Sequence, residues 1–140
     1  METLLCQPEQ VRELLPQREP ILMVDSLYSH SEQGCTAGLR IKKDNLFCLG
    51  GLFIAEGIIE HIAQSASLYM GYQSHQKEQG VAIGYLGEVK SFELFSSPRV
   101  GDQLVTSITI ISYVMRIMLI AAETRCNGQL VATCRMKIST

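Results

Sequence analysis

One long segment of helical period, followed by four segments of strand period, constrains this chain more than any other feature. Residues 57 to about 72 place Ile58, Ile62, Ala66 and further apolar side chains within an arc of about 140°. After residue 80 the period changes to two, and residues 81–95, 103–113, 116–126 and 129–138 each predict a strand. One helix cannot cover both faces of such a sheet. We therefore expect an α+β subunit in which the sheet wraps around the helix or a second chain covers the rest, and either arrangement favours a dimer.

The first half of the chain predicts shorter elements. Pro8 opens a short helix that Pro16 ends, because proline fits the first helical position and cannot continue a helix. Residues 20–27 and 37–42 predict two strands.

The five cysteines do not predict a disulfide or zinc framework. They include no C-x-x-C pair, and their odd number leaves one thiol over. The Asn-Gly pair at residues 127–128 predicts a two-residue hairpin turn that pairs Cys126 with Gln129 and places Cys134 beside Ala121. Cys126 and Cys134 then do not meet. We expect free, buried thiols in a reducing cytoplasm and no metal site.

Length and charge exclude other classes of protein. The 140 residues suit a single domain, residues 1–140, and a formal net charge of −2 lacks the basic excess that nucleic-acid binding needs. The longest uncharged, mostly apolar run, residues 46–55, is about half as long as a membrane crossing. The N-terminal residues are acidic, unlike those of a secretory signal. We expect a cytoplasmic protein without a membrane span.

Four segments carry a resemblance to a known family. Residues 14–25 contain L-P-Q-R-E-P-I-L-M-V-D, and residues 58–64 read I-I-E-H-I-A-Q. Residues 97–104 read S-P-R-V-G-D-Q-L, and residues 127–132 read N-G-Q-L-V-A. In this order they resemble the L-P-H-R-x-P-x-L-L-V-D, I-I-E-x-M-A-Q, x-P-V-x-P-G-D-Q-L and D-G-K-L-V-A segments of the 3-hydroxyacyl-ACP dehydratases of the FabA/FabZ type. The resemblance covers nearly the whole chain and implies the hotdog fold, a curved antiparallel sheet wrapped around one long central helix.

The resemblance also implies a site. In that family a histidine from one subunit and a helix carboxylate from the other act together on an acyl thioester at the dimer interface. Glu60 stands at the position of the acid, and Gln64 lies one turn below it, in a position to orient it. Gly50, Gly51 and Gly57 are candidates for close backbone approach to the thioester. Substrates would be acyl groups on acyl carrier protein or coenzyme A, and no cofactor or metal is implied.

The family's base is missing. No histidine lies between Asp44 and Glu60, and Gln17 stands where the opening motif usually has a histidine. Two weaker substitutes remain as hypotheses. His61 lies about 100° around the helix from Glu60, so the two side chains diverge, and Cys48 lies in the segment where the base is usual. Loss of a general base costs on the order of 10²- to 10⁴-fold in rate.

Three functions therefore stay open. The first is a 3-hydroxyacyl-ACP dehydratase-like lyase whose base is unusual or comes from another chain, in fatty-acid, polyketide or aryl-polyene-like biosynthesis. The second is a non-catalytic hotdog subunit that completes the site of a histidine-bearing partner, in a hetero-oligomer rather than a homodimer. The third is an acyl thioesterase in which Glu60 activates water. Fold resemblance alone does not decide between them.

Overall fold

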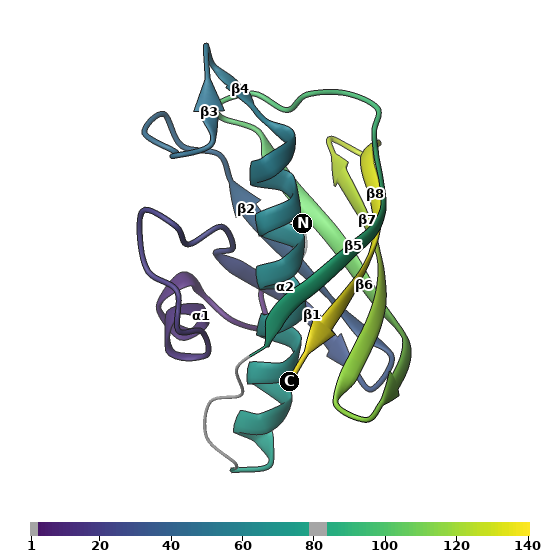
Figure 1. Cartoon of the computed structure of the whole chain (residues 1–140). Coiled ribbons are helices and arrows are strands. Elements are labelled where there is room, and N and C mark those ends of the chain that lie inside the picture. The colour runs from purple at the N-terminus through teal and green to yellow at the C-terminus, as the bar shows by residue number, and fades with distance from the viewer. Residues whose placement is uncertain (1–2, 79–83) are drawn as a thin grey trace.

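The computed structural model describes residues 3–78 and 84–140 of the chain. Figure 1 shows one long helix lying across a curved sheet, with a short helix and a small hairpin beside it. The helices are α1 (Pro8–Glu13) and α2 (Ala55–Gln76). The strands are β1 (Ser26–Ser31), β2 (Gly34–Arg40), β3 (Cys48–Leu49), β4 (Leu52–Phe53), β5 (Tyr85–Leu94), β6 (Gln103–Val114), β7 (Ile117–Cys126) and β8 (Gln129–Ser139).

Six strands form one antiparallel sheet in the order β1-β2-β6-β7-β8-β5, and β3 and β4 form a separate hairpin. The sheet curves around α2, as Figure 1 shows, and the apolar face of the helix packs against it. Ile58, Ile62 and Ala66 on the helix are fully buried, as are Ile120 and Met136 on the sheet. The expected hotdog architecture is confirmed.

Several elements expected from the sequence have other boundaries in the structure, and the strand expected over residues 37–42 is β2, Gly34–Arg40. The strand expected over residues 20–27 begins only at Ser26, and residues 20–25 form a turn and an irregular segment. The β3–β4 hairpin was not expected, because two-residue strands are too short to show a period. Helix α2 extends beyond both expected ends, and residues 81–83 of the strand expected over residues 81–95 lie outside the described residues.

The C-terminal hairpin forms as expected but with a shifted register. Asn127 and Gly128 both have positive φ, and Cys126 pairs with Gln129. Cys134 lies opposite Ala122, not Ala121, because β8 carries one extra residue where the register shifts between Thr124 and Arg125. All five cysteines are free.

Candidate active site

Glu60, Gln64 and Ser67 form a polar stripe along α2, and this stripe is not the solvent face of the helix. An amphipathic helix ordinarily exposes such residues, yet Gln64 is 1% exposed and Ser67 is 5% exposed. Glu60, on the same stripe, is half-buried. The stripe therefore faces protein, and its side chains need hydrogen-bond partners within the fold.

Gln64 joins α2 to the irregular segment at residues 20–25. Its Oε1 accepts a hydrogen bond from the Met23 backbone N–H at 2.6 Å. Its Nε2 donates to the Ile21 backbone oxygen at 2.8 Å and to Oε1 of Glu60 at 2.8 Å. Both hydrogens of the amide nitrogen are then used, so Gln64 is saturated as a donor. Glu60 is thus held by a rigid neighbour one helical turn away, as the spacing predicted.

His61 is a buried structural group in this geometry. Its Nδ1 lies 2.7 Å from the Met23 backbone oxygen, which can only accept, so Nδ1 carries the proton. Its Nε2, 2.9 Å from Oγ1 of Thr106, then accepts from that hydroxyl. Thr124 in turn lies 2.8 Å from Thr106. Burial lowers the pKa of His61, which keeps the ring neutral. Both nitrogens are engaged and the side chain is fully buried, so His61 holds the backbone oxygen of Met23 while Gln64 holds its N–H.

Glu60 and Gln64 line a depression of about 170 Å³. Gln17, from the loop after α1, and Ser67 add two further polar side chains, while Tyr85 and Leu86 form the wall at β5. The full lining is Gln17, Glu60, Ala63, Gln64, Ser67, Gly84, Tyr85, Leu86 and Ile138. Within the described residues this lining includes no histidine. In the sequence, Gln17 differs from its neighbours only as a departure from the family motif.

The β3–β4 hairpin places three other candidates away from this depression. Gly50 and Gly51 have φ values of +59° and +82° and form its tip, where an added Cβ would meet nothing within 4 Å. These two glycines therefore allow the positive φ values that the turn requires. Cys48 is half-buried, and burial raises the pKa of its thiol, so the thiolate that a base requires is disfavoured. None of the three lines the depression beside Glu60.

Gly57 serves the packing of the first turn of α2. A Cβ at this position would lie 2.6 Å from Cβ of Phe47 and 2.6 Å from Cζ of Phe53. The missing Cβ therefore lets the helix backbone approach these two phenylalanine side chains closely. No side chain caps the N-terminus of α2 at Ile54, so its first N–H groups have no side-chain acceptor.

Residues 3–78 and 84–140 contain neither a metal-binding cluster nor a membrane-spanning helix. No group of three or more histidine, cysteine or acidic side chains is placed to hold a metal ion. No helix there is both long and apolar enough to cross a membrane.

The family model of the ApeP-like proteins, described as ApeP dehydratase, matches residues 9–140. This chain belongs to that family. The membership confirms the resemblance to the hotdog dehydratases that the four sequence segments indicated, and it makes the chain a dehydratase-like protein. No curated protein sequence matches the chain.

Solved structures of low identity share its fold. The dehydratase heterocomplex ApeI:P from Xenorhabdus doucetiae superposes with a TM-score of 0.86 at 17% identity, over 93% of this chain and 90% of that chain. A hypothetical thioesterase with coenzyme A from Streptococcus pneumoniae gives a TM-score of 0.64 at 9% identity, over 81% and 82% of the two chains. A Streptococcus mutans protein bound to acetyl CoA gives 0.67 at 13% identity, over 89% and 94%. At these identities the likeness establishes the fold.

Proposed function

We propose that this chain supplies the acid half of a divided 3-hydroxyacyl thioester dehydratase site, and that a second hotdog subunit supplies the histidine base. The observation that carries the proposal is the placement of Glu60. Gln64 holds this carboxyl in a depression that borders strand β5 and that, in the described part of the chain, no histidine lines. The pathway class is fatty-acid, polyketide or aryl-polyene-like biosynthesis.

The chemistry needs one base and one acid. The base removes the proton from C2, the carbon next to the thioester carbonyl. The C2–H electron pair forms the C2–C3 double bond, and the C3–O bond breaks. Protonated Glu60 gives its proton to the departing hydroxyl, which leaves as water. Gln64 donates to Oε1 of Glu60, which leaves Oε2 for the substrate. The uncapped N-terminus of α2 supports the same reaction, because free N–H groups stabilise a thioester oxygen as it becomes enolate-like.

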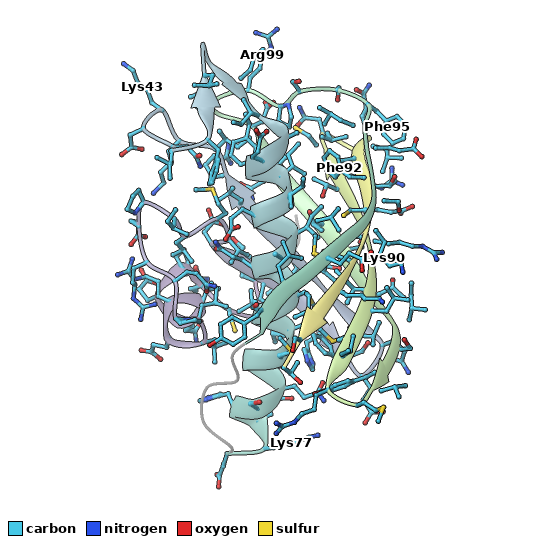
Figure 2. The ribbon with its side chains drawn as sticks, in the orientation of Figure 1. Lys43, Lys77, Lys90, Phe92, Phe95 and Arg99 are labelled. Carbon is cyan, nitrogen blue, oxygen red and sulfur yellow. The ribbon has the colours of Figure 1, made fainter. Side chains whose placement is uncertain are left out.

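Strand β5 is the surface on which we expect the partner. It pairs with β8 and ends the sheet, so its outer side has no strand partner in the described part of the chain. An exposed strand edge with free N–H and C=O groups pairs readily with another strand. Tyr85 and Leu86, which wall the depression, are 67% and 43% exposed. Figure 2 shows Lys90, Phe92 and Phe95 in succession farther along this edge. A partner here would reach the Glu60 depression, and the relative from Xenorhabdus doucetiae is itself a heterocomplex.

An acyl carrier protein is the donor that we expect, with coenzyme A as the alternative. Lys43 and Arg99 project at the end of the molecule that carries the β3–β4 hairpin, as Figure 2 shows, and Arg99 forms a backbone bridge to Leu52 of that hairpin. This is also the end at which α2 begins. Two cations beside the proposed thioester position suit an acidic carrier. Reversal of both charges should raise KM for a carrier-bound substrate and leave KM for a pantetheine substrate unchanged.

The deciding experiment measures enoyl thioester formation by absorbance from a 3-hydroxyacyl pantetheine substrate. The samples are this chain, a histidine-bearing hotdog protein encoded nearby, and their co-purified complex. The complex should turn over, and Glu60→Gln in this chain should lower turnover by about 10²- to 10⁴-fold, because the amide cannot give up a proton to the leaving hydroxyl. Glu56→Gln, at an exposed position in the first turn of the same helix, is the matched control and should remain active.

The other outcomes each name a different function. Full activity of the complex with Glu60→Gln would make this chain a non-catalytic stabilising subunit. Activity of the chain alone as a homodimer would require a base of its own, with His61 and Cys48 as the candidates to substitute. Release of free thiol from acyl-CoA without enoyl product would assign a thioesterase. Each of these results would contradict the proposed division of acid and base.

A further inference from the structure

The turn between β6 and β7 combines an apolar sequence with a strained backbone. It consists of Met115 and Arg116, whose φ values are +53° and +66°. Val114 and Ile117 pair on either side of it, so the turn has two residues. Both φ values lie in the left-handed region, which costs free energy for any residue that carries a Cβ. We call residues 113–117 the hairpin tip.

Two other two-residue turns in the described part of the chain have positive φ at both positions, and their residues suit that geometry. Gly50 and Gly51 form the β3–β4 turn. Asn127 and Gly128 form the β7–β8 turn. Asparagine and glycine adopt the left-handed region at little cost. The fold therefore does not require methionine and arginine at the β6–β7 turn, and the strain that they cause points to a role outside the fold.

The surface of the hairpin tip is apolar and carries one positive charge. Met115 is 90% exposed, more than any other large apolar side chain of the described residues, and Val114 is 62% exposed. Tyr113 and Ile117 are exposed as well. Arg116 is the one charged residue in the sequence from 103 to 122, and it forms no ion pair with any described residue. Exposed apolar side chains that cluster in this way mark a binding surface.

The hairpin tip belongs to neither the carrier surface nor the partner surface proposed for this chain. Figure 1 shows the β6–β7 turn at the end of the molecule where α2 ends, opposite the β3–β4 hairpin. Lys43 and Arg99, labelled in Figure 2, lie at that opposite end. Strand β8 lies between this hairpin and β5, so a partner that pairs with β5 binds at a different strand. The tip therefore needs a ligand of its own.

We propose that the hairpin tip binds the surface of a phospholipid membrane. This inference does not depend on the proposed dehydratase reaction. A stable protein–protein interface uses about 20–30 residues from each side, and a single projecting turn does not supply such an area. Shallow insertion into a membrane suits the tip better. Its apolar side chains enter the boundary of the acyl chains, Tyr113 stays at the level of the headgroups, and Arg116 reaches the lipid phosphates.

The test measures sedimentation of the full chain, in complex with its hotdog partner, with vesicles of equal parts phosphatidylcholine and phosphatidylglycerol. The decisive variant, Met115→Asn with Arg116→Gly, gives the β6–β7 turn the sequence of the β7–β8 turn. It should bind at least about tenfold more weakly, because burial of one fully exposed side chain of this size contributes about 10- to 100-fold. Leu49→Ser, at a 66% exposed leucine beside the β3–β4 turn, is the matched control and should bind like the wild type.

The single variant Arg116→Gln tests the role of the charge. The wild-type complex should bind the mixed vesicles more tightly than vesicles of phosphatidylcholine alone, because an arginine near the surface is attracted to anionic headgroups. Arg116→Gln should remove this difference. An equal preference for the mixed vesicles in this variant would overturn the assignment of Arg116 to the lipid phosphates.

Thermal unfolding separates a lipid-binding tip from a structural one. The double variant should have a higher thermal midpoint than the wild type, because asparagine and glycine relieve the strain of the turn. Weaker vesicle binding would then accompany greater stability, which loss of structure cannot produce. An equal or lower midpoint would overturn the inference, since the native turn would then serve the fold.

Three further results would contradict membrane binding by the hairpin tip. The first is equal vesicle binding by the double variant, and the second is no vesicle binding by the wild type. The third is self-association of the wild-type complex, in place of vesicle binding, that the double variant loses, because the tip would then bind a second copy. Enoyl formation in solution tests the dehydratase function separately, so that function stands or falls without these results.

Discussion

Gln64→Leu tests whether Gln64 organises the candidate site. Gln64 is 1% exposed and makes three hydrogen bonds, to the Met23 N–H, the Ile21 oxygen and Glu60. Leucine fills a similar volume and makes none of them. The change therefore isolates the polar contacts from the packing of the helix.

The expected cost is dominated by one group. Met23 is 1% exposed, and its N–H would lose the one acceptor that it has among the described residues, which costs about 1–3 kcal/mol. Ile21 is 41% exposed, so water can satisfy its carbonyl oxygen, and Glu60 is half-buried and partly solvated. The burial of the leucine side chain offsets little of this cost, because the aliphatic part of the Gln64 side chain is already buried. We expect the free energy of unfolding to fall by about 1–3 kcal/mol.

Urea denaturation followed by far-UV circular dichroism measures this change. The chain has no tryptophan, so tryptophan fluorescence does not report on its unfolding. Gln76→Leu is the matched control, because Gln76 is an exposed glutamine at the end of the same helix. It should change stability by no more than about 0.5 kcal/mol. Equal stability of Gln64→Leu and Gln76→Leu would refute the role of Gln64 as a structural anchor.

The remaining predictions concern the acid, the buried histidine and the helix start. Glu60→Gln should lower the dehydration rate of the complex by about 10²- to 10⁴-fold with little change in its thermal midpoint, and an unchanged rate would remove Glu60 from the mechanism. Burial lowers the pKa of His61, so its contribution to stability is complete above the ordinary histidine pKa of about 6.5 and is lost as pH falls towards the lowered folded pKa. Urea titrations across this range should show a smaller pH dependence for His61→Gln than for the wild type, and equal slopes would contradict the assignment. Gly57→Ala should lower the free energy of unfolding by about 1–3 kcal/mol, because its Cβ would lie 2.6 Å from Phe53. A stability gain in the same denaturation experiment would show that the ring can move aside.

Several features follow from the sequence alone because their signals are local. The 3.6-residue period places Glu60 and Gln64 on one stripe of α2, and their hydrogen bond forms at this spacing. The two-residue period predicts the long strands, and the Asn-Gly pair predicts the positive φ values at residues 127 and 128. The family segments add the hotdog architecture, which the family match supports.

Other features depend on contacts between segments far apart in the chain. Residues 20–25 have the composition of a strand, but the Met23 peptide binds Gln64 and His61, which are 41 and 38 residues away. The same contacts bury the polar stripe of α2, which a helical period alone would assign to solvent. No local pattern shows that Gln17 lies in the depression with Glu60. Sequence periodicity determines which side chains share a face of an element. Only tertiary packing decides what that face meets, because buried polar groups take their partners from whichever segment the fold brings near.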